Sequence, residues 1–129
     1  MKKFILMFVV VIFFTMSACA KQSNKFSIEN LSNNVEQVTV THYLSGEEFK
    51  WTIENDELEH WKSWLSSLSA RQKDFKEGNT PGDVDGGEIY IFMVNNEESS
   101  ISYVINGDDE CYLIYEKEWY VVSKPTDPF

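Results

Sequence analysis

The residues of this chain best suited to chemistry are its two histidines and the carboxylates near them. His60 lies one helical turn after Asp56, so a pair of His60 with Asp56 or Glu57 would suit a degenerate hydrolase. His42 shares the apolar side of a segment with strand spacing, which favours a partly buried structural role. Neither histidine has a second histidine or a cysteine at zinc-ligand spacing, so we predict no zinc site.

Motifs of the common enzyme classes are missing from the sequence. It contains no G-x-S-x-G elbow, no Walker loop, no G-x-G-x-x-G turn and no H-E-x-x-H helix. Enzymes that depend on these motifs are therefore excluded. We predict a protein that is not an enzyme and needs no cofactor.

A short acidic segment, residues 83–88, is the best candidate for a metal site, because carboxylates beside glycines can surround calcium. Its detailed match to an EF-hand loop fails. With Asp83 and Asp85 at the third and fifth loop positions, Pro81 and Phe92 fall at the first and twelfth, where oxygen ligands are required. We therefore predict no metal site and a turn into the next strand, and we keep Asp83 and Asp85 as weak candidates for partner binding.

Aromatic residues in the C-terminal part form the second candidate site. Trp119, Tyr120 and Tyr103 could stack on a sugar or contact a partner, since tyrosine and tryptophan suit half-wet surfaces. Cross-strand aromatic pairs also stabilise small sheets, by about 0.2 to 1 kcal/mol each. Sheet packing is the simpler explanation, and a surface that binds cell-envelope carbohydrate is the alternative.

Hydrophobic spacing predicts the elements that position these residues. Residues 37–44 and 49–53 alternate as strands, and Ser45-Gly46 between them predicts a hairpin. Asp56 is predicted to cap a helix, with Glu59 completing a capping box. The apolar stripe of that helix comprises Leu58, Trp61, Trp64, Leu65 and Leu68. We expect the helix to end near Gln72, with Arg71 and Lys73 close to its C-terminus and Phe75 tucked under its end.

The second half of the chain predicts an antiparallel meander. Residues 76–87 contain Pro81 and four glycines and are predicted to be a loop. Four strands follow, over residues 88–94, 100–105, 111–116 and 118–123, and the first of them has apolar residues on both faces and should be central. The predicted fold class is α+β, an antiparallel sheet in ββ-α-ββββ order with one amphipathic helix on one face.

The net charge limits the partners that this protein can bind. Eleven basic and twenty-one acidic side chains in 129 residues give a formal charge of −10, which argues against nucleic acid. An acidic surface favours cationic partners, although acidic residues also serve solubility alone.

The N-terminus has the order of an export signal. Lys2 and Lys3 precede eleven apolar residues, 4–14, and then small residues. Eleven helical residues cover roughly 17 Å, too short for the roughly 30 Å core of a bilayer. The sequence Met16-Ser17-Ala18-Cys19 resembles the lipobox of bacterial lipoproteins, although Met16 replaces the usual leucine. The resemblance implies removal of residues 1–18 and a diacylglycerol on Cys19. An ordinary signal peptide cut near Ala18 or Ala20, or an uncleaved anchor, is the alternative.

These observations lead to one functional hypothesis. Residues 19–36 are expected to form a lipidated tether with a short strand near residues 25–29, and residues 37–129 a single domain. Loss of Lys2 and Lys3 leaves nine basic and twenty-one acidic side chains, a formal charge of −12. With Cys19 lipidated, Cys111 stands alone in an apolar run, which favours a buried, inert thiol. We predict a lipoprotein on the extracytoplasmic face of the cell membrane that binds a basic protein or peptide, such as an inhibitor or immunity protein.

Overall fold

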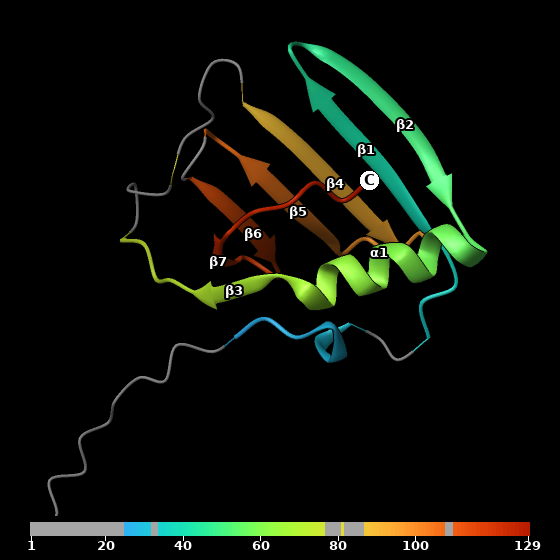
Figure 1. Cartoon of the computed structure of the whole chain (residues 1–129), viewed down its shortest axis with the longest axis horizontal. Helices are drawn as coiled ribbons and strands as arrows, with labels where there is room; N and C mark the ends of the chain where they lie inside the picture. Colours follow the sequence, from blue (N-terminus) through green and yellow to red (C-terminus); the bar gives the residue numbers. More distant parts are fainter. Residues whose placement is uncertain (1–24, 32–33, 77–80, 82–86, 108–109) are drawn as a thin grey trace, which may run out of the picture.

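The computed structural model describes residues 25–31, 34–76, 81, 87–107 and 110–129. One seven-stranded sheet with the order β2-β1-β4-β5-β6-β7-β3 dominates the fold, and every adjacent pair of strands is antiparallel. The strands are β1 (Val38–Leu44), β2 (Glu47–Ile53), β3 (Ser69–Gln72), β4 (Glu88–Val94), β5 (Ser100–Ile105), β6 (Cys111–Tyr115) and β7 (Glu118–Ser123). Helix α1 (Asn55–Ser67) crosses one face of the sheet (Figure 1). The predicted α+β architecture is confirmed.

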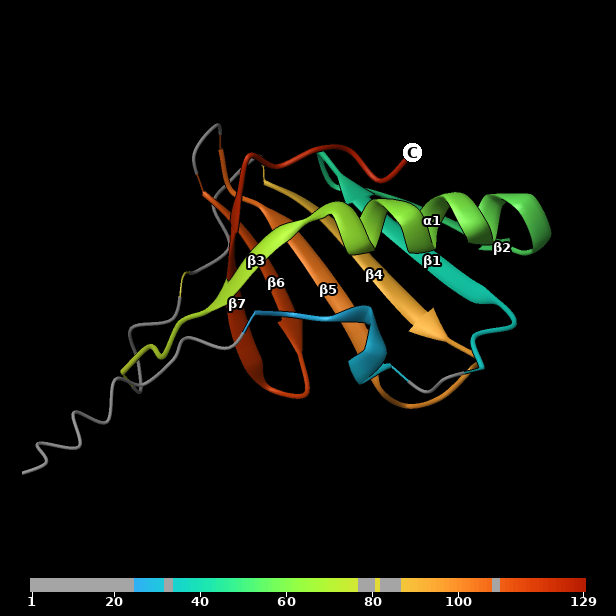
Figure 2. The same cartoon turned by 60° about the horizontal axis from the view of Figure 1, so that its bottom comes forward.

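The two faces of the sheet have different roles. Figure 2 shows α1 and the C-terminal segment on the same side of the sheet, which we call the helix face. The other side, the open face, carries Ile89, Ile91, Val104, Ile114, Trp119 and Val121. Strand β4 lies inside the sheet between β1 and β5, and both of its faces are apolar, as the sequence predicts.

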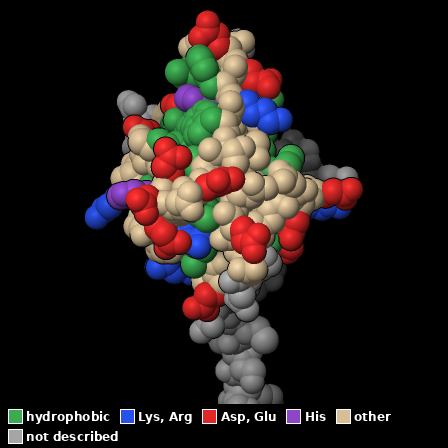
Figure 3. Space-filling model, turned by 90° about the vertical axis from the view of Figure 1, so that its right-hand side faces the viewer, with side chains coloured by type: hydrophobic (Ala, Val, Ile, Leu, Met, Phe, Trp, Pro, Cys, Tyr) green, Lys and Arg blue, Asp and Glu red, His purple; other side chains and the backbone are tan. Residues whose placement is uncertain are grey.

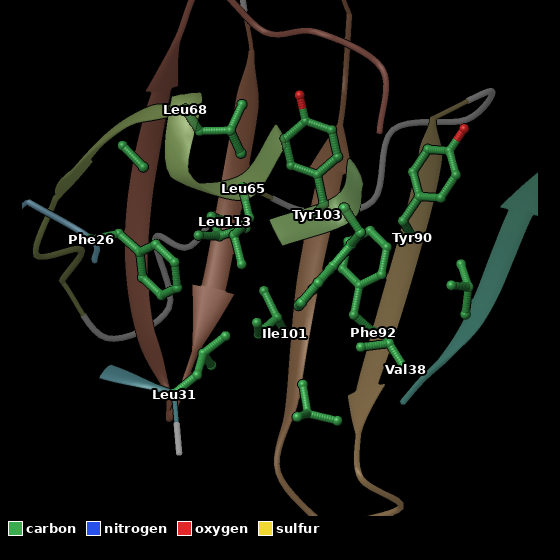
Figure 4. Close-up of a cluster of buried hydrophobic side chains, with 14 of the residues drawn as sticks. Phe26, Leu31, Val38, Leu65, Leu68, Tyr90, Phe92, Ile101, Tyr103 and Leu113 are labelled. Atoms are coloured by element: carbon green, nitrogen blue, oxygen red, sulfur yellow. The ribbon is translucent and has the colours of Figure 1, made fainter. Parts of the chain in front are cut away.

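The core lies between α1 and the helix face (Figure 4). Trp61 of the helix packs against Phe92 of β4 with ring centroids 5.4 Å apart, and both side chains are fully buried. Trp64 contacts Tyr103 edge-to-face at 5.0 Å. Burying each large apolar side chain contributes about 1.5 to 3 kcal/mol, so these contacts hold the helix on the sheet. The predicted apolar stripe of the helix is confirmed.

The start of α1 differs from the prediction. The helix begins at Asn55, whose φ is +54°, and its N-cap residue is Glu54, which makes no side-chain capping hydrogen bond. Asp56 lies inside the first turn, so the predicted capping box of Asp56 and Glu59 is wrong. Asparagine tolerates positive φ better than most residues, which lets the chain turn sharply from β2 into the helix, so that the N-cap lies two residues earlier than predicted.

The end of α1 also differs, because the helix ends at Ser67 and not near Gln72. Leu68 adopts an extended conformation, and residues 69–72 form β3, which pairs with β7 so that Ala70 lies opposite Val122. Ala70 is fully buried there. Pairing with a neighbouring strand therefore overrides the helical tendency of this segment.

The residues directly after β3 contact the sheet and not the end of the helix. The backbone N–H of Lys73 donates to the carbonyl of Trp119 at 2.9 Å. Phe75 contacts Tyr112 and Trp119 on the open face, so the predicted positions of Phe75, Arg71 and Lys73 near the helix end are wrong.

The segment of residues 25–31 belongs to the domain. The Phe26 N–H donates to the Ala70 carbonyl at 2.9 Å, and Lys25 forms a bridge with Arg71. A 3-10 helix, η1 (Ile28–Asn30), follows in place of the predicted short strand. Phe26 and Leu31 are each only 5% exposed in the core. No helix in the described part of the chain is long and apolar enough to cross a membrane.

Candidate functional site

The most developed site is a cleft of about 330 Å³ on the helix face, where β1 ends, β4 begins and the C-terminal segment passes. It combines two carboxylates with aromatic, aliphatic and backbone groups. The lining residues are Leu44, Glu88, Tyr103, Ile105, Gly107, Pro125, Thr126 and Asp127.

Glu88 is at the centre of a hydrogen-bonded group of three residues. Its Oε1 lies 2.7 Å from Nε2 of His42 and 2.9 Å from the hydroxyl of Tyr90. An ionised carboxylate only accepts hydrogen bonds, so both His42 and Tyr90 donate to it. Because the β1–β4 register places His42 opposite Tyr90 and Leu44 opposite Glu88, the sheet itself brings the three side chains together.

Tyr90 is held firmly in this group. Its ring stacks on the imidazole of His42 with centroids 4.0 Å apart and planes 3° from parallel. Burial raises the pKa of Tyr90, and the hydrogen bond to Glu88 and the charges of Glu88 and Asp127 raise it further. The Tyr90 hydroxyl therefore stays protonated at neutral pH and remains a donor to Glu88.

The C-terminal segment, residues 124–129, forms one wall of the cleft. The carbonyl of Thr126 accepts hydrogen bonds from Nε1 of Trp64 at 3.2 Å and from the hydroxyl of Tyr103 at 2.9 Å. Phe129 contacts Trp51 edge-to-face at 5.4 Å. Helix, sheet and C-terminal segment thus meet at the cleft. Burial is the main reason why the pKa of Tyr103 is raised, and the charge of Asp127 adds to the shift.

Apolar side chains form an exposed rim beside the cleft. Leu44, Phe49 and Phe129 are 40%, 46% and 57% exposed, and the ring of Phe49 lies 6.0 Å from that of His42. Figure 3 views the molecule from this side, where hydrophobic side chains gather beside a histidine with carboxylates around them. Exposed apolar groups next to polar groups are typical of interaction sites.

The predicted aromatic platform does not exist as one surface. Tyr103 and Tyr120 lie on the helix face and are 0% and 7% exposed, so they cannot stack on a sugar. Trp119 lies on the open face, where it contacts Tyr112 edge-to-face at 5.8 Å. The period-two spacing of strands separates Trp119 from its neighbour Tyr120, which is why the three residues are not brought together.

The remaining candidates from the sequence are the acidic segment and His60. Asp83 and Asp85 lie outside the described residues. His60 is exposed on α1 beside a surface hollow that Asp56 also lines, but no hydrogen bond joins His60 to Asp56 or Glu57 in the described part of the chain. No group of three or more potential metal ligands occurs among the described residues.

Cys111 is fully buried, as predicted. Burial raises the pKa of its thiol to about 11. Because nucleophilic cysteines react as thiolates, this residue is protonated and inert at neutral pH.

Sequence reasoning missed the group formed by His42, Glu88 and Tyr90. Alternation placed His42 on the apolar face of its strand, and the predicted boundary of the next long strand fell at Glu88. What joins them is the pairing of β1 with β4, two strands between which β2, α1 and β3 intervene in the chain. Comparisons with family models, with curated proteins and with solved structures give no significant match to the chain.

Proposed function

We propose that this protein is a non-enzymatic binding protein, held on the extracytoplasmic face of the cell membrane by a lipid on Cys19, whose cleft binds a cationic segment of another protein or peptide. The observation that carries the proposal is the position of Glu88 and Asp127 in one cleft with apolar and aromatic walls. An inhibitor or immunity protein that neutralises a basic toxin or hydrolase would have these properties.

The electrostatics of the cleft favour a cation. The side chain of Glu88 is 26% exposed, so its carboxylate is partly removed from water, and the Tyr90 hydroxyl that donates to it brings no charge. Asp127 adds a second carboxylate to the lining. A lysine or arginine side chain could form charge-assisted hydrogen bonds there, which are about twice as strong as neutral ones. The domain charge of −12 would also steer cationic ligands toward it.

The rim favours a peptide or protein over a small cation. The exposed side chains of Leu44, Phe49 and Phe129 offer apolar contacts next to the carboxylates. A ligand larger than a single cation could contact these side chains and the carboxylates together. Interfaces between proteins combine such apolar centres with polar surroundings. A ligand that alternates basic and apolar side chains should use both parts of the site.

Binding of labelled peptides tests this proposal. We would compare a hexalysine peptide with a hexapeptide that alternates lysine and leucine, using the lipidated protein in detergent and a series of salt concentrations. We expect the alternating peptide to bind more tightly. Glu88→Gln and Asp127→Asn should each weaken its binding by about tenfold, the loss of roughly one charge-assisted hydrogen bond.

Glu57→Gln is the matched control, because Glu57 is an exposed carboxylate in the first turn of α1, away from the cleft lining. It removes the same charge and should leave the affinity within about twofold. Equal losses in Glu88→Gln and Glu57→Gln would show that only net charge attracts the peptide. That result, or no binding of either peptide at low salt, would overturn the proposal.

A further inference from the structure

The two edge strands of the sheet, β3 and β2, differ in whether another segment of the chain pairs with their outer side. At the β3 edge, Phe26 donates a backbone hydrogen bond to Ala70, and Lys25 forms a bridge with Arg71. At the other edge, no described segment pairs with the outer side of β2. Strand β2 is seven residues long, and an open edge of this kind can accept another strand.

The turn between β1 and β2 defines which backbone groups face this open edge. Ser45 and Gly46 have φ of +52° and +81°, which fits a two-residue type I′ turn closed by the pair Leu44 and Glu47. Alternate residues of an antiparallel ladder bond to opposite sides. The backbone N–H and C=O groups of Glu48, Lys50 and Thr52 therefore point away from β1.

We infer that two copies of this protein pair through their β2 edges, antiparallel and about a two-fold axis at Phe49. In this register Phe49 lies opposite Phe49 of the second copy. Glu48 of each copy lies opposite Lys50 of the other. The interface is thus self-complementary, as a two-fold symmetric contact must be.

Charge selects this register over its neighbours. Both Glu48 and Lys50 project from the open face, since they pair with Tyr43 and Thr41 of β1. A shift by two residues in one direction places Lys50 opposite Lys50, and a shift in the other direction places Glu48 opposite Glu48. Like charges directly opposite each other destabilise antiparallel pairs, whereas opposite charges stabilise them.

Exposed apolar side chains add to this contact. Phe49 is 46% exposed on the edge strand, and Tyr43 and Leu44 in the neighbouring strand are 37% and 40% exposed. Strand pairing would cover the two Phe49 rings with each other, and in the dimer the apolar contacts to a ligand would come from Leu44 and Phe129, which stay outside the paired strands. A contact of a few residues is small compared with stable dimer interfaces, so we expect it to form mainly where the proposed lipid anchor concentrates the protein on a membrane.

This dimer has a consequence for binding. A two-fold axis between antiparallel edge strands of one continuous sheet runs perpendicular to the sheet, so the helix faces of both copies lie on the same side. The two clefts would open on that side together. A partner with two basic segments could then occupy both and gain affinity from the linkage.

Cysteine crosslinking in membranes of expressing cells tests the register. Phe49 forms a non-hydrogen-bonded pair with itself in the dimer, with Cα atoms about 4.5 Å apart, a separation that fits a disulfide. After mild oxidation, Phe49→Cys should give at least about tenfold more disulfide dimer than the parent chain, whose Cys111 is buried. Trp51→Cys is the register control and should stay near the parent level, because Trp51 lies opposite Glu47 of the second copy.

Exchange of charges provides the second arm, with each variant carrying Phe49→Cys and one of two tags. Expressed alone, Glu48→Lys and Lys50→Glu should each give about fivefold less crosslinked dimer, or lower still. In each of these dimers, like charges lie opposite one another at positions 48 and 50. Coexpression of the two variants should restore the crosslink between different tags. Glu98→Lys and Lys117→Glu, in exposed turns outside β2, should change nothing.

Failure of Phe49→Cys to crosslink above the parent chain, or failure of the mixed charge variants to recover, would overturn this dimer. A stronger crosslink for Trp51→Cys than for Phe49→Cys would also reject the register. None of these outcomes bears on the peptide affinity of the cleft. The dimer rests on the proposed lipid anchor, so fatty-acid labelling of Cys19 in the same cells distinguishes a missing anchor from a failed contact between the β2 edges.

Discussion

The imidazole of His42 lies parallel to the ring of Tyr90, 4.0 Å away, and both donate to the same oxygen of Glu88. Because His42 and Tyr90 are directly opposite each other in neighbouring strands, this contact fixes the end of the β1–β4 pair next to the cleft. The aromatic packing and the hydrogen bonds therefore place Glu88 where a ligand can reach it.

Removing the hydroxyl of Tyr90 tests how much this arrangement contributes to stability. Tyr90→Phe keeps the ring stacked on His42 but deletes one donor to Glu88, so the free energy of unfolding should fall by about 1 kcal/mol. His42→Ala also loses the stacking and should cost more, about 2 kcal/mol. Urea unfolding measures both changes.

Tyr112→Phe serves as the comparison, because Tyr112 lies on the open face, away from Glu88. Its effect should stay within about 0.5 kcal/mol, as for most substitutions at sites that are not buried. A loss in Tyr90→Phe no larger than that in Tyr112→Phe would mean that the bond to Glu88 does not stabilise the fold.

The buried thiol of Cys111 should make the free energy of unfolding depend on pH in the alkaline range. Burial raises its pKa from the ordinary cysteine value of 9.0 to about 11 in the folded protein. The unfolded chain then loses this proton first, so stability is intact below pH 9 and falls as the pH rises toward 11. The loss from this group should be roughly 2 to 3 kcal/mol.

Cys111→Ala separates this contribution from that of the tyrosines, whose pKa values are also raised. The variant should be less stable at neutral pH, because it leaves a small cavity, but its stability should decline less steeply between pH 9 and pH 11. Identical pH slopes for the variant and the parent chain would contradict the raised pKa of Cys111.

Much of the fold could be predicted because strands and helices have different spacings. The alternation around Val40 indicated the apolar side of its strand, and Val40 is fully buried. The strand of Phe92 is apolar on both sides, so its spacing predicted a central position but not which side the helix covers. The end of α1 could not be predicted from spacing. Residues 69–72 become a strand because β7 lies beside them, and their partners in β7 are about fifty positions later in the chain.

The candidate site could not be predicted for a similar reason. Its members come from β1, β4, β5 and the C-terminal segment, and only the strand order brings Glu88 to His42 and Thr126 to Tyr103. Residues 25–31 were expected to belong to a tether, whereas Phe26 lies in the core against Tyr120 at 5.3 Å.

Phe26→Ala tests this boundary. A phenylalanine that is 5% exposed and packs edge-to-face on Tyr115 and Tyr120 should contribute as a core residue does. We expect its truncation to cost about 3 to 4 kcal/mol in thermal or urea unfolding. Glu29→Ala, at an exposed position in the same segment, should cost less than about 0.5 kcal/mol. If Phe26→Ala and Glu29→Ala both changed the free energy of unfolding only slightly, residues 25–31 would be part of the tether and not of the domain.

Attachment of lipid to Cys19 is the remaining prediction, and it decides where the acidic domain acts. Cells grown with a fatty-acid probe should label the parent chain and not Cys19→Ala, while Cys111→Ala should still be labelled, because its thiol is buried in the domain. Each buried methylene contributes roughly 0.8 kcal/mol. Two acyl chains therefore hold a protein on a bilayer, whereas a protein with a single acyl chain dissociates readily. The parent chain should therefore stay with the membrane through a high-salt wash, which removes proteins bound by charge alone. A labelled Cys19→Ala chain, or a parent chain that the wash releases, would rule out this anchor.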